Sequence, residues 1–179
     1  MTHEIIIAGF GGQGIMLMGQ LLAYAGMLEK KHVSWIPSYG PEMRGGTANC
    51  SVIVSDQVIG APIVSEPTIL IAMNNPSLFK FEQSVQAGGT IIVNSSLVSR
   101  DPLRDDVTTI KIPANDIADQ LGIKRVANIV TLGAMLKKID IVEKDSIIKS
   151  LNKVFNSKPD IVTLNTVAFE RGQLDVIGK

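Results

Sequence analysis

The chain has 179 residues, of which 45% are hydrophobic and 4% aromatic, and its 17 basic and 17 acidic side chains give a formal net charge of zero. This length suits one domain with a substantial core, so residues 1–179 are expected to form a single domain. A neutral chain with few aromatic side chains offers neither the charge nor the stacking surface that nucleic acids or anionic membranes require.

Cys50 is the single cysteine of the chain. It can form no disulfide within the chain, and it cannot hold an iron–sulfur cluster without thiolates from elsewhere. The first residues carry neither the basic region nor the long apolar segment of a signal peptide. No apolar run approaches the roughly 20 residues that span a bilayer. We therefore expect a cytoplasmic protein.

The predicted elements begin with a strand, a glycine-rich turn and a helix. The β-branched run at 4–9 predicts a buried strand that is stopped by glycine. From 13 to 29 the hydrophobic period becomes helical, with a stripe of large apolar side chains beside a stripe of small ones. The small stripe contains Gly19, Ala23 and Gly26, and we expect it to let the helix approach its neighbour closely.

A second strand at 32–37 precedes a glycine-rich loop and an alternating strand at 47–56. The turn SDQ at 55–57 leads to the apolar stretch 58–63, so the sequence predicts a hairpin between 47–56 and 58–63. One face of the alternating strand carries Ala48, Cys50, Val52 and Val54.

Strands and helices then alternate towards the C-terminus. Buried strands are predicted at 68–73, 89–96 and 107–113, with a helix from near Pro76 between the first two, and further helices at 114–122, 128–139, 143–155 and 159–172. Asn128 is the predicted N-cap of the helix at 128–139. This alternation predicts an α/β fold of three layers: a mostly parallel sheet with helices on both faces, one antiparallel hairpin and a Rossmann-like first βα unit.

The first candidate site is the glycine turn, in which Gly9, Gly11 and Gly14 have the G-x-G-x-x-G spacing between a strand and a helix. The free N–H groups at such a helix start favour an anion. A dinucleotide site also needs an acid at the end of the second strand, and none stands at 36–38. A tight corner, an anion or acyl-carrier phosphate site and a dinucleotide site stay open. Gln13 can donate and accept hydrogen bonds, which suits a polar partner group or solvent alike.

The second candidate site is the loop SYGPEMRGG, residues 38–46. Glu42 and Arg44 offer one charge of each sign, two residues apart, so each is free to meet a group elsewhere. Long glycine-rich loops at the carboxyl end of a strand are where α/β sheets place ligands and interfaces. An exposed loop with a solvated pair of charges is the alternative.

These two stretches together resemble the gamma subunit of the 2-oxoacid:ferredoxin oxidoreductases. The similarity continues through RVANIVTLGA at 125–134 and NTVAFERG at 165–172, so it covers essentially the whole chain in order. Within that group the chain looks most like the 2-oxoglutarate or branched-chain types, with the pyruvate type not excluded.

The resemblance implies a place in a complex that oxidatively decarboxylates a 2-oxoacid to its acyl-CoA and reduces ferredoxin. It also implies thiamine diphosphate and magnesium between alpha and beta subunits, and iron–sulfur clusters in the beta and delta subunits. The gamma chain itself would bind no cofactor and would not be catalytic when isolated, and it could form a homodimer when its partners are absent.

The resemblance also assigns expected roles to the two candidate sites. Gly9, Gly11, Gly12, Gln13 and Gly14 would face CoA or a partner subunit. The residues expected to dock on the catalytic core are Ser38, Tyr39, Gly40, Pro41, Glu42, Arg44, Gly45, Gly46 and Asn128. Two other functions stay open on the residues alone: a stand-alone nucleotide-binding enzyme that uses the glycine turn, and a regulatory binding module.

The remaining reactive side chains are not predicted to be catalytic. Cys50 lies on the inward face of its predicted strand, as a small apolar residue would. His3 and His32 stand at strand starts and have no acid, serine or cysteine partner in a recognisable motif.

Overall fold

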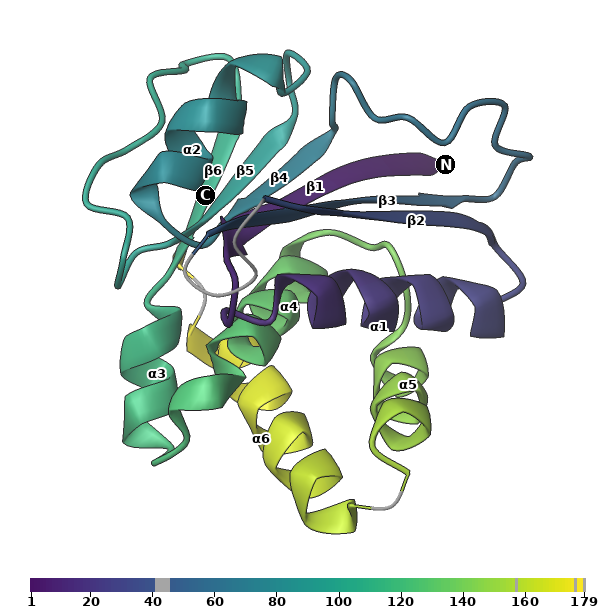
Figure 1. The fold of residues 1–179 in the computed structure, drawn as a ribbon, viewed down its shortest axis with the longest axis vertical. Coiled ribbons are helices and arrows are strands. Elements are labelled where there is room, and N and C mark those ends of the chain that lie inside the picture. The colour runs from purple at the N-terminus through teal and green to yellow at the C-terminus, as the bar shows by residue number, and fades with distance from the viewer. Residues whose placement is uncertain (41–45, 157, 176, 179) are drawn as a thin grey trace.

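The computed structural model describes residues 1–40, 46–156, 158–175 and 177–178, the last two by their backbone alone. A sheet forms the middle of three layers (Figure 1). Helix α2 covers one face of the sheet, and α1 and α4 cover the other, with α3, α5 and α6 packed around them. This confirms the predicted α/β class with helices on both faces.

Within the described residues the sheet has seven strands, in the order β2-β3-β1-β4-β5-β6-β7. Strands β1, β4, β5 and β6 are parallel, whereas β3 runs antiparallel to β1, and β7 antiparallel to β6. The strands are β1 Thr2–Phe10, β2 His32–Tyr39, β3 Thr47–Ser55, β4 Ile69–Ala72, β5 Thr90–Asn94, β6 Thr108–Ile112 and β7 Ile177–Gly178.

The antiparallel hairpin is formed by β2 and β3, which pair from His32 opposite Ser55 to Tyr39 opposite Ala48. The predicted pairing of 47–56 with 58–63 is wrong, because residues 58–63 form no strand. Pro62 lies in this stretch, and proline cannot donate a hydrogen bond to a sheet ladder.

The helices lie close to the predicted ranges. The predicted end of the last helix near Gly172 is early, because that helix continues to Asp175. The described helices are α1 Ile15–Leu28, α2 Asn75–Phe81, α3 Ala114–Gln120, α4 Ala127–Lys138, α5 Lys144–Val154 and α6 Pro159–Asp175, with 3₁₀ turns at Glu82–Ser84 and Lys124–Val126.

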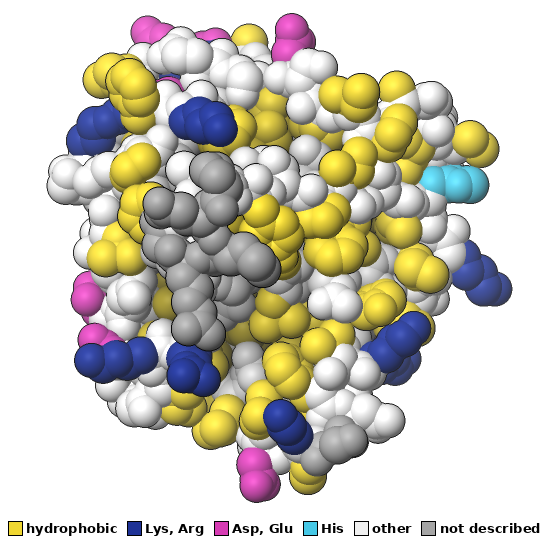
Figure 2. Space-filling model, in the orientation of Figure 1, with side chains coloured by type: hydrophobic (Ala, Val, Ile, Leu, Met, Phe, Trp, Pro, Cys, Tyr) yellow, Lys and Arg dark blue, Asp and Glu magenta, His cyan; other side chains and the backbone are white. Residues whose placement is uncertain are grey.

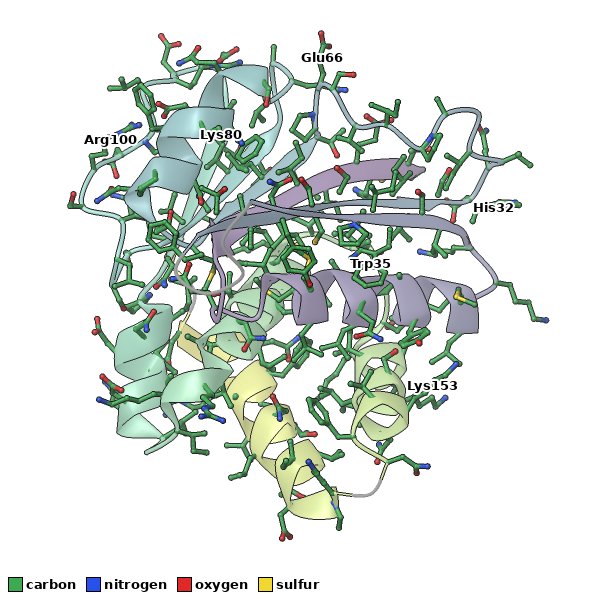
Figure 3. All side chains as sticks on the ribbon, in the orientation of Figure 1. His32, Trp35, Glu66, Lys80, Arg100 and Lys153 are labelled. Atoms are coloured by element: carbon green, nitrogen blue, oxygen red, sulfur yellow. The ribbon has the colours of Figure 1, made fainter. Side chains whose placement is uncertain are left out.

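Helix α1 packs closely on β2 and β3 through its small residues, as predicted. A Cβ atom added to Gly19 would lie 2.7 Å from Cys50 Sγ and from Trp35 Nε1, and one added to Gly26 would lie 2.6 Å from Val33 Cγ1. Trp35 therefore lies between the sheet and α1 (Figure 3). The inward face of β3 is also confirmed, since its four predicted residues are buried.

The parallel strands place one edge of the sheet at the candidate site. Their carboxyl ends lead into the glycine turn after β1, the start of α2 after β4, and α3 after β6. Ligands of open α/β sheets bind outside this edge. His3 and His32 lie near the N-terminal ends of β1 and β2, at the edge of the sheet opposite the candidate site.

Candidate functional site

The glycine turn joins β1 to α1 and needs glycine at two positions. Gly12 has φ 100°, and Gly14, the N-cap residue of α1, has φ 73°, a left-handed conformation that other residues adopt at a cost. A Cβ atom at Gly12 would meet nothing within 4 Å, so the turn is open on that side. Helix α1 has no side-chain cap and no acid in its first turn. Its start is therefore positive and available to a polar group from outside.

The side-chain amide of Gln13 stabilises the turn by hydrogen bonds within the chain. Its Oε1 accepts hydrogen bonds from the Phe10 N–H at 2.7 Å and from Asn74 Nδ2 at 2.9 Å, and its Nε2 donates to the Met73 carbonyl at 3.3 Å. Asn74 also caps α2 by accepting from the Ser77 N–H at 2.9 Å. The amide of Gln13 thus links the ends of β1 and β4, and its bonding capacity is largely used within the chain.

The two glycine-rich segments meet at this edge. The Gly11 N–H donates to the Gly46 carbonyl at 2.9 Å, and the Gly40 N–H donates to the Thr47 carbonyl at 2.8 Å. Ser38 and Tyr39 end β2, and Tyr39 is 54% exposed. The other predicted docking residues of this loop, Pro41, Glu42, Arg44 and Gly45, lie outside the described residues.

Asn128 joins the glycine turn from α4. Its predicted role as N-cap is wrong, because the N-cap residue of α4 is Val126 and Asn128 lies inside the first helical turn. Instead, its Nδ2 donates to the Gly14 carbonyl at 3.3 Å, across 114 residues of sequence. A Cβ atom at Gly14 would collide with this amide, so glycine there also makes room for Asn128.

A cleft of about 270 Å³, here called the outer cleft, opens beside the turn. On the face shown in Figure 2, hydrophobic side chains gather over β2 and α1, and Lys and Arg lie mostly toward the rim. Met27, Leu28, Ile36 and Tyr39 are exposed hydrophobic residues of these two elements. The outer cleft is lined by Phe10, Gly11, Gly12, Gly14, Ile15, Met16, Leu17, Tyr39 and Ala48.

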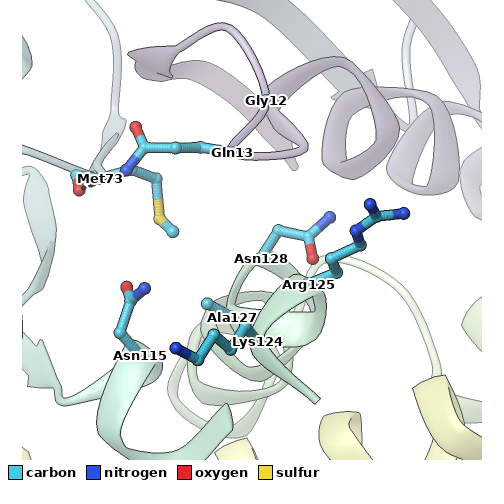
Figure 4. Close-up of a pocket in the computed structure, with 8 residues that line it drawn as sticks. All are labelled: Gly12, Gln13, Met73, Asn115, Lys124, Arg125, Ala127 and Asn128. Carbon is cyan, nitrogen blue, oxygen red and sulfur yellow. Dashed lines mark hydrogen bonds between the residues drawn. The ribbon is translucent and has the colours of Figure 1, made fainter. Parts of the chain in front are cut away.

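A second, more polar cavity of about 100 Å³ lies on the other side of the turn, and we call it the amide cavity. Figure 4 shows side chains from the glycine turn, α3 and α4 around it. Two positive charges, Lys124 and Arg125, stand in its wall, so it favours an anionic group. The amide cavity is lined by Gly12, Gln13, Met73, Asn115, Lys124, Arg125, Ala127 and Asn128.

Several polar residues at this edge of the sheet are not among those predicted from the sequence. Asn74 follows β4, Asn94 ends β5 and Asn115 opens α3 after β6. Polar residues directly after buried strands are the signal that could have found them, since parallel strands bring their carboxyl ends together. Lys124 and Arg125 have no such signal, because a short 3₁₀ turn brings them to the cavity.

Cys50, His3 and His32 line neither the outer cleft nor the amide cavity. Cys50 is fully buried, and its Sγ donates to the Ile15 carbonyl at 3.6 Å. Burial raises the pKa of the Cys50 thiol to about 12, so the reactive thiolate is suppressed at neutral pH. Burial also lowers the pKa of His3, which keeps that side chain neutral at pH 7.

The order of the strands in the sheet differs from that of a dinucleotide-binding unit. In a dinucleotide-binding unit the second strand lies beside the first and ends in the acid that holds the ribose. Here β2 is separated from β1 by β3, and β2 ends at Tyr39. Among the described residues, no group of three or more His, Cys, Asp or Glu could hold a metal ion. None of the helices in the described ranges is long and apolar enough to cross a membrane.

Comparison with known proteins decides the family. Residues 4–173 match the family described as pyruvate ferredoxin/flavodoxin oxidoreductase. The chain belongs to this family. The resemblance carried by the glycine turn, the second glycine-rich loop and the two C-terminal motifs is thereby confirmed.

Three members of known sequence or structure define the relationship. Ketoisovalerate oxidoreductase subunit VorA of Methanothermobacter thermautotrophicus is 40% identical over 170 residues, 94% of this chain and 35% of VorA, so the chain spans about a third of that relative. The 2-oxoglutarate synthase subunit KorC of Methanocaldococcus jannaschii is 39% identical over 176 residues, 96% of this chain and 92% of KorC. The keto/oxoacid ferredoxin oxidoreductase gamma subunit of Geobacter sulfurreducens has a TM-score of 0.82 at 31% identity, covering 97% of each chain.

Proposed function

We propose that the chain is the gamma subunit of a 2-oxoacid:ferredoxin oxidoreductase of the 2-oxoglutarate type. The complex would decarboxylate 2-oxoglutarate oxidatively, form succinyl-CoA and reduce ferredoxin. In this proposal the chain is not catalytic by itself. The glycine turn contacts CoA through the outer cleft, and the end of β2 docks on the catalytic subunits.

Family membership and the KorC relative support the overall assignment. KorC is named as a subunit of 2-oxoglutarate synthase, and the alignment includes 92% of its length at 39% identity. The proposed partners are alpha, beta and delta subunits, with thiamine diphosphate and magnesium between alpha and beta, and iron–sulfur clusters in beta and delta. With Cys50 as its one cysteine, buried, this chain offers no set of thiolates for a cluster.

The observation that carries the site assignment is the hydrogen bond from the Gly11 N–H to the Gly46 carbonyl. It holds the two glycine-rich segments side by side at the carboxyl edge of the sheet. The uncapped start of α1 and the exposed ring of Tyr39 thus border one cleft. A polar helix start beside apolar walls suits CoA, which joins charged phosphates to a long neutral arm.

The test is reconstitution with the thiamine-dependent partner subunits, using Tyr39→Ala. An exposed aromatic ring at an interface contributes strongly to binding, so we expect recovery of partner subunits on a tagged gamma chain to fall at least tenfold. For complex that does assemble, we expect a several-fold higher KM for CoA at saturating 2-oxoglutarate. Wild-type complex should form acyl-CoA from 2-oxoglutarate at least tenfold faster than from ketoisovalerate or pyruvate.

Phe79→Ala is the matched control, since Phe79 is 75% exposed on α2, on the other face of the sheet. It should leave recovery and the KM for CoA unchanged. If no thiamine-dependent subunit is recovered with the wild-type chain, the assignment to this complex is wrong. If Tyr39→Ala behaves like Phe79→Ala, the docking role of this edge is wrong.

A further inference from the structure

We propose that an extended segment of a catalytic partner subunit pairs with β2 in the assembled complex and adds one strand to the sheet. The binding groups are the outward N–H and C=O groups of residues 33–39, here called the free edge. The inference rests on the proposed function for the identity of the partner. It goes beyond the docking of Tyr39, because it assigns binding to main-chain groups along the whole strand.

The first support is the place of β2 in the sheet. Within the described residues β2 is an outermost strand, with β3 beside it and no strand on its other side. At the opposite edge of the sheet, β7 pairs with β6 and covers part of that strand. The chain thus covers one edge in part and leaves the other available. A free sheet edge is a template on which another chain can add a strand.

The second support is the direction of the backbone groups along β2. The Gly40 N–H donates to the Thr47 carbonyl at 2.8 Å, and these two residues follow directly on the paired stretch of β2 and β3. In an antiparallel pair, hydrogen-bonded positions alternate with positions whose backbone groups point away from the partner strand. Even-numbered residues of β2 therefore bond to β3, and no described residue gives the outward groups of the odd-numbered ones a hydrogen bond. The residues of the free edge are Val33, Trp35, Pro37 and Tyr39.

The third support is the composition of β2. Edge strands that stay unpaired are usually protected by charged side chains, and residues 33–39 carry none. Val33 and Trp35 direct their side chains to α1, where they lie close to Gly26 and Gly19. Hydrophobic side chains gather over β2 and α1 (Figure 2). A segment that continues this face of β2 therefore carries apolar side chains toward α1 and no charged ones.

Pro37 favours a different chain over a second copy as the occupant. It stands on the free edge and has no N–H, so a strand paired with β2 lacks a donor opposite Pro37. In a symmetric pairing of β2 with β2 of a second copy, each copy brings this proline, and a pairing along the whole strand leaves a carbonyl without a donor on both sides. A segment of a different chain meets Pro37 once, and its own sequence can be adapted to that position.

The VorA relative also favours a different chain. The match covers 94% of this chain and only 35% of VorA, so most of VorA lies outside this domain. In that relative the domain is joined to further polypeptide, which needs a surface of the domain to pack on. An open sheet edge beside an apolar face suits that role, because main-chain hydrogen bonds give affinity and alternate side chains give specificity.

The test is hydrogen exchange of single backbone amides, in the free chain and in the complex reconstituted with the thiamine-dependent subunits. In the free chain the amides of Val33 and Trp35 should exchange faster than those of Ser34 and Ile36, which bond to β3. On assembly we expect the exchange rates of Val33 and Trp35 to fall about tenfold or more, so that the difference between the two sets narrows.

Each other outcome of the exchange experiment overturns the inference. Unchanged rates for Val33 and Trp35 in an assembled complex would overturn it and leave the proposed function standing. Slowing of the same amides in the free chain as its concentration is raised would mean that the occupant is a second copy. Recovery of no thiamine-dependent subunit with the wild-type chain would overturn both the inference and the proposed function.

A pair of variants at one position separates the main chain from the side chain. Val33→Pro removes an outward N–H and leaves the hydrogen bonds between β2 and β3 in place, because this N–H does not bond to β3. Val33→Ala loses the same side chain and keeps the N–H, so it is the matched control. We expect a tagged Val33→Pro chain to recover about fivefold less partner subunit than Val33→Ala. Equal recovery by the two folded variants would overturn the inference, and if Val33→Pro does not fold, the exchange rates of the wild-type chain decide.

Discussion

At the scale of single residues, Glu82 is the most deeply buried ion-pairing side chain among the described residues, at 2% exposure. Arg100 donates to both of its carboxylate oxygens, at 3.0 and 2.7 Å, and the Leu103 N–H donates at 3.1 Å. Figure 3 shows Arg100 beside α2, where this contact holds the loop after β5. Burial alone would raise the pKa of Glu82, but these hydrogen bonds and the charges of Arg100 and Arg104 outweigh it, so its pKa lies below the usual range.

We predict that Glu82→Gln lowers the free energy of unfolding by about 1–3 kcal/mol at pH 7, because it leaves the partly buried guanidinium of Arg100 without its negatively charged partner. Arg100 keeps 32% of its side chain exposed, which favours the lower half of that range. The pKa of Glu82 is lower in the folded state than in the unfolded state, where it is about 4.3, so the ionised carboxylate stabilises the fold above about pH 4.3. This stabilisation is lost as the pH falls through the folded-state pKa. The difference between wild type and variant should therefore shrink below about pH 4.

Urea denaturation across this pH range measures the effect. Glu66→Gln, which removes an exposed carboxylate, is the control and should change the free energy by less than about 0.5 kcal/mol at every pH. A Glu82→Gln difference that stays constant down to pH 3 would contradict the electrostatic explanation.

At the scale of elements, the sequence predicted each strand of the sheet core and each helix, but it did not predict which strand pairs with β3. Strand β4 is a four-residue run buried throughout, and such runs carry their own signal. Strand β3 has two candidate hairpin partners in the sequence, β2 and residues 58–63. The alternation along β3 is compatible with either partner, so it does not predict the observed pairing with β2. Gln13, Tyr39 and Asn128 are candidate site residues that the sequence named. Asn115, Lys124 and Arg125, which line the amide cavity, are residues that it did not name. The contact of Asn128 with Gly14 crosses 114 residues, so no local pattern contains it.

The crossing of α4 and α6 is a second contact that local patterns hide. Gly172 lies within α6 and is buried, although glycine near a predicted helix end suggests termination. A Cβ atom at Gly172 would collide with the Val130 carbonyl, and one at Gly133 would collide with the backbone of Phe169. Each helix therefore presents a glycine to the backbone of the other.

We predict that Gly172→Ala destabilises the fold by about 3 kcal/mol, the upper part of the range for overpacking, because the obstacle is backbone that cannot rotate away. For a chain of this size that corresponds to a fall in Tm of roughly 6–12 °C. Gly60→Ala is the control, since a Cβ atom there would meet nothing within 4 Å. Differential scanning calorimetry of both variants measures the shifts. Equal Tm values would mean that α4 and α6 can separate freely.

At the scale of the whole molecule, one continuous core joins the two ends of the chain. The larger hydrophobic cluster includes Ile5 on β1 and Phe169 on α6. Hydrogen bonds also connect the end of α1 to the segment before α5. Lys31 Nζ donates to the Ile141 carbonyl at 2.6 Å, and the Glu143 N–H donates to Glu29 Oε1 at 2.7 Å. A boundary between separate domains would require few contacts to cross it.

We therefore predict that residues 1–179 unfold as one cooperative unit. Trp35 is the single tryptophan and reports on β2 and α1, whereas far-UV circular dichroism is dominated by the helices, several of which lie in the C-terminal half. The two signals should give the same urea midpoint, as a two-state transition requires. Lys31→Ala removes the hydrogen bond to the Ile141 carbonyl, which links the end of α1 to the segment before α5. It should lower both midpoints by the same amount, corresponding to a loss of about 0.5–1.5 kcal/mol in the free energy of unfolding. Separate midpoints in the wild-type chain would mean that the C-terminal helices fold independently.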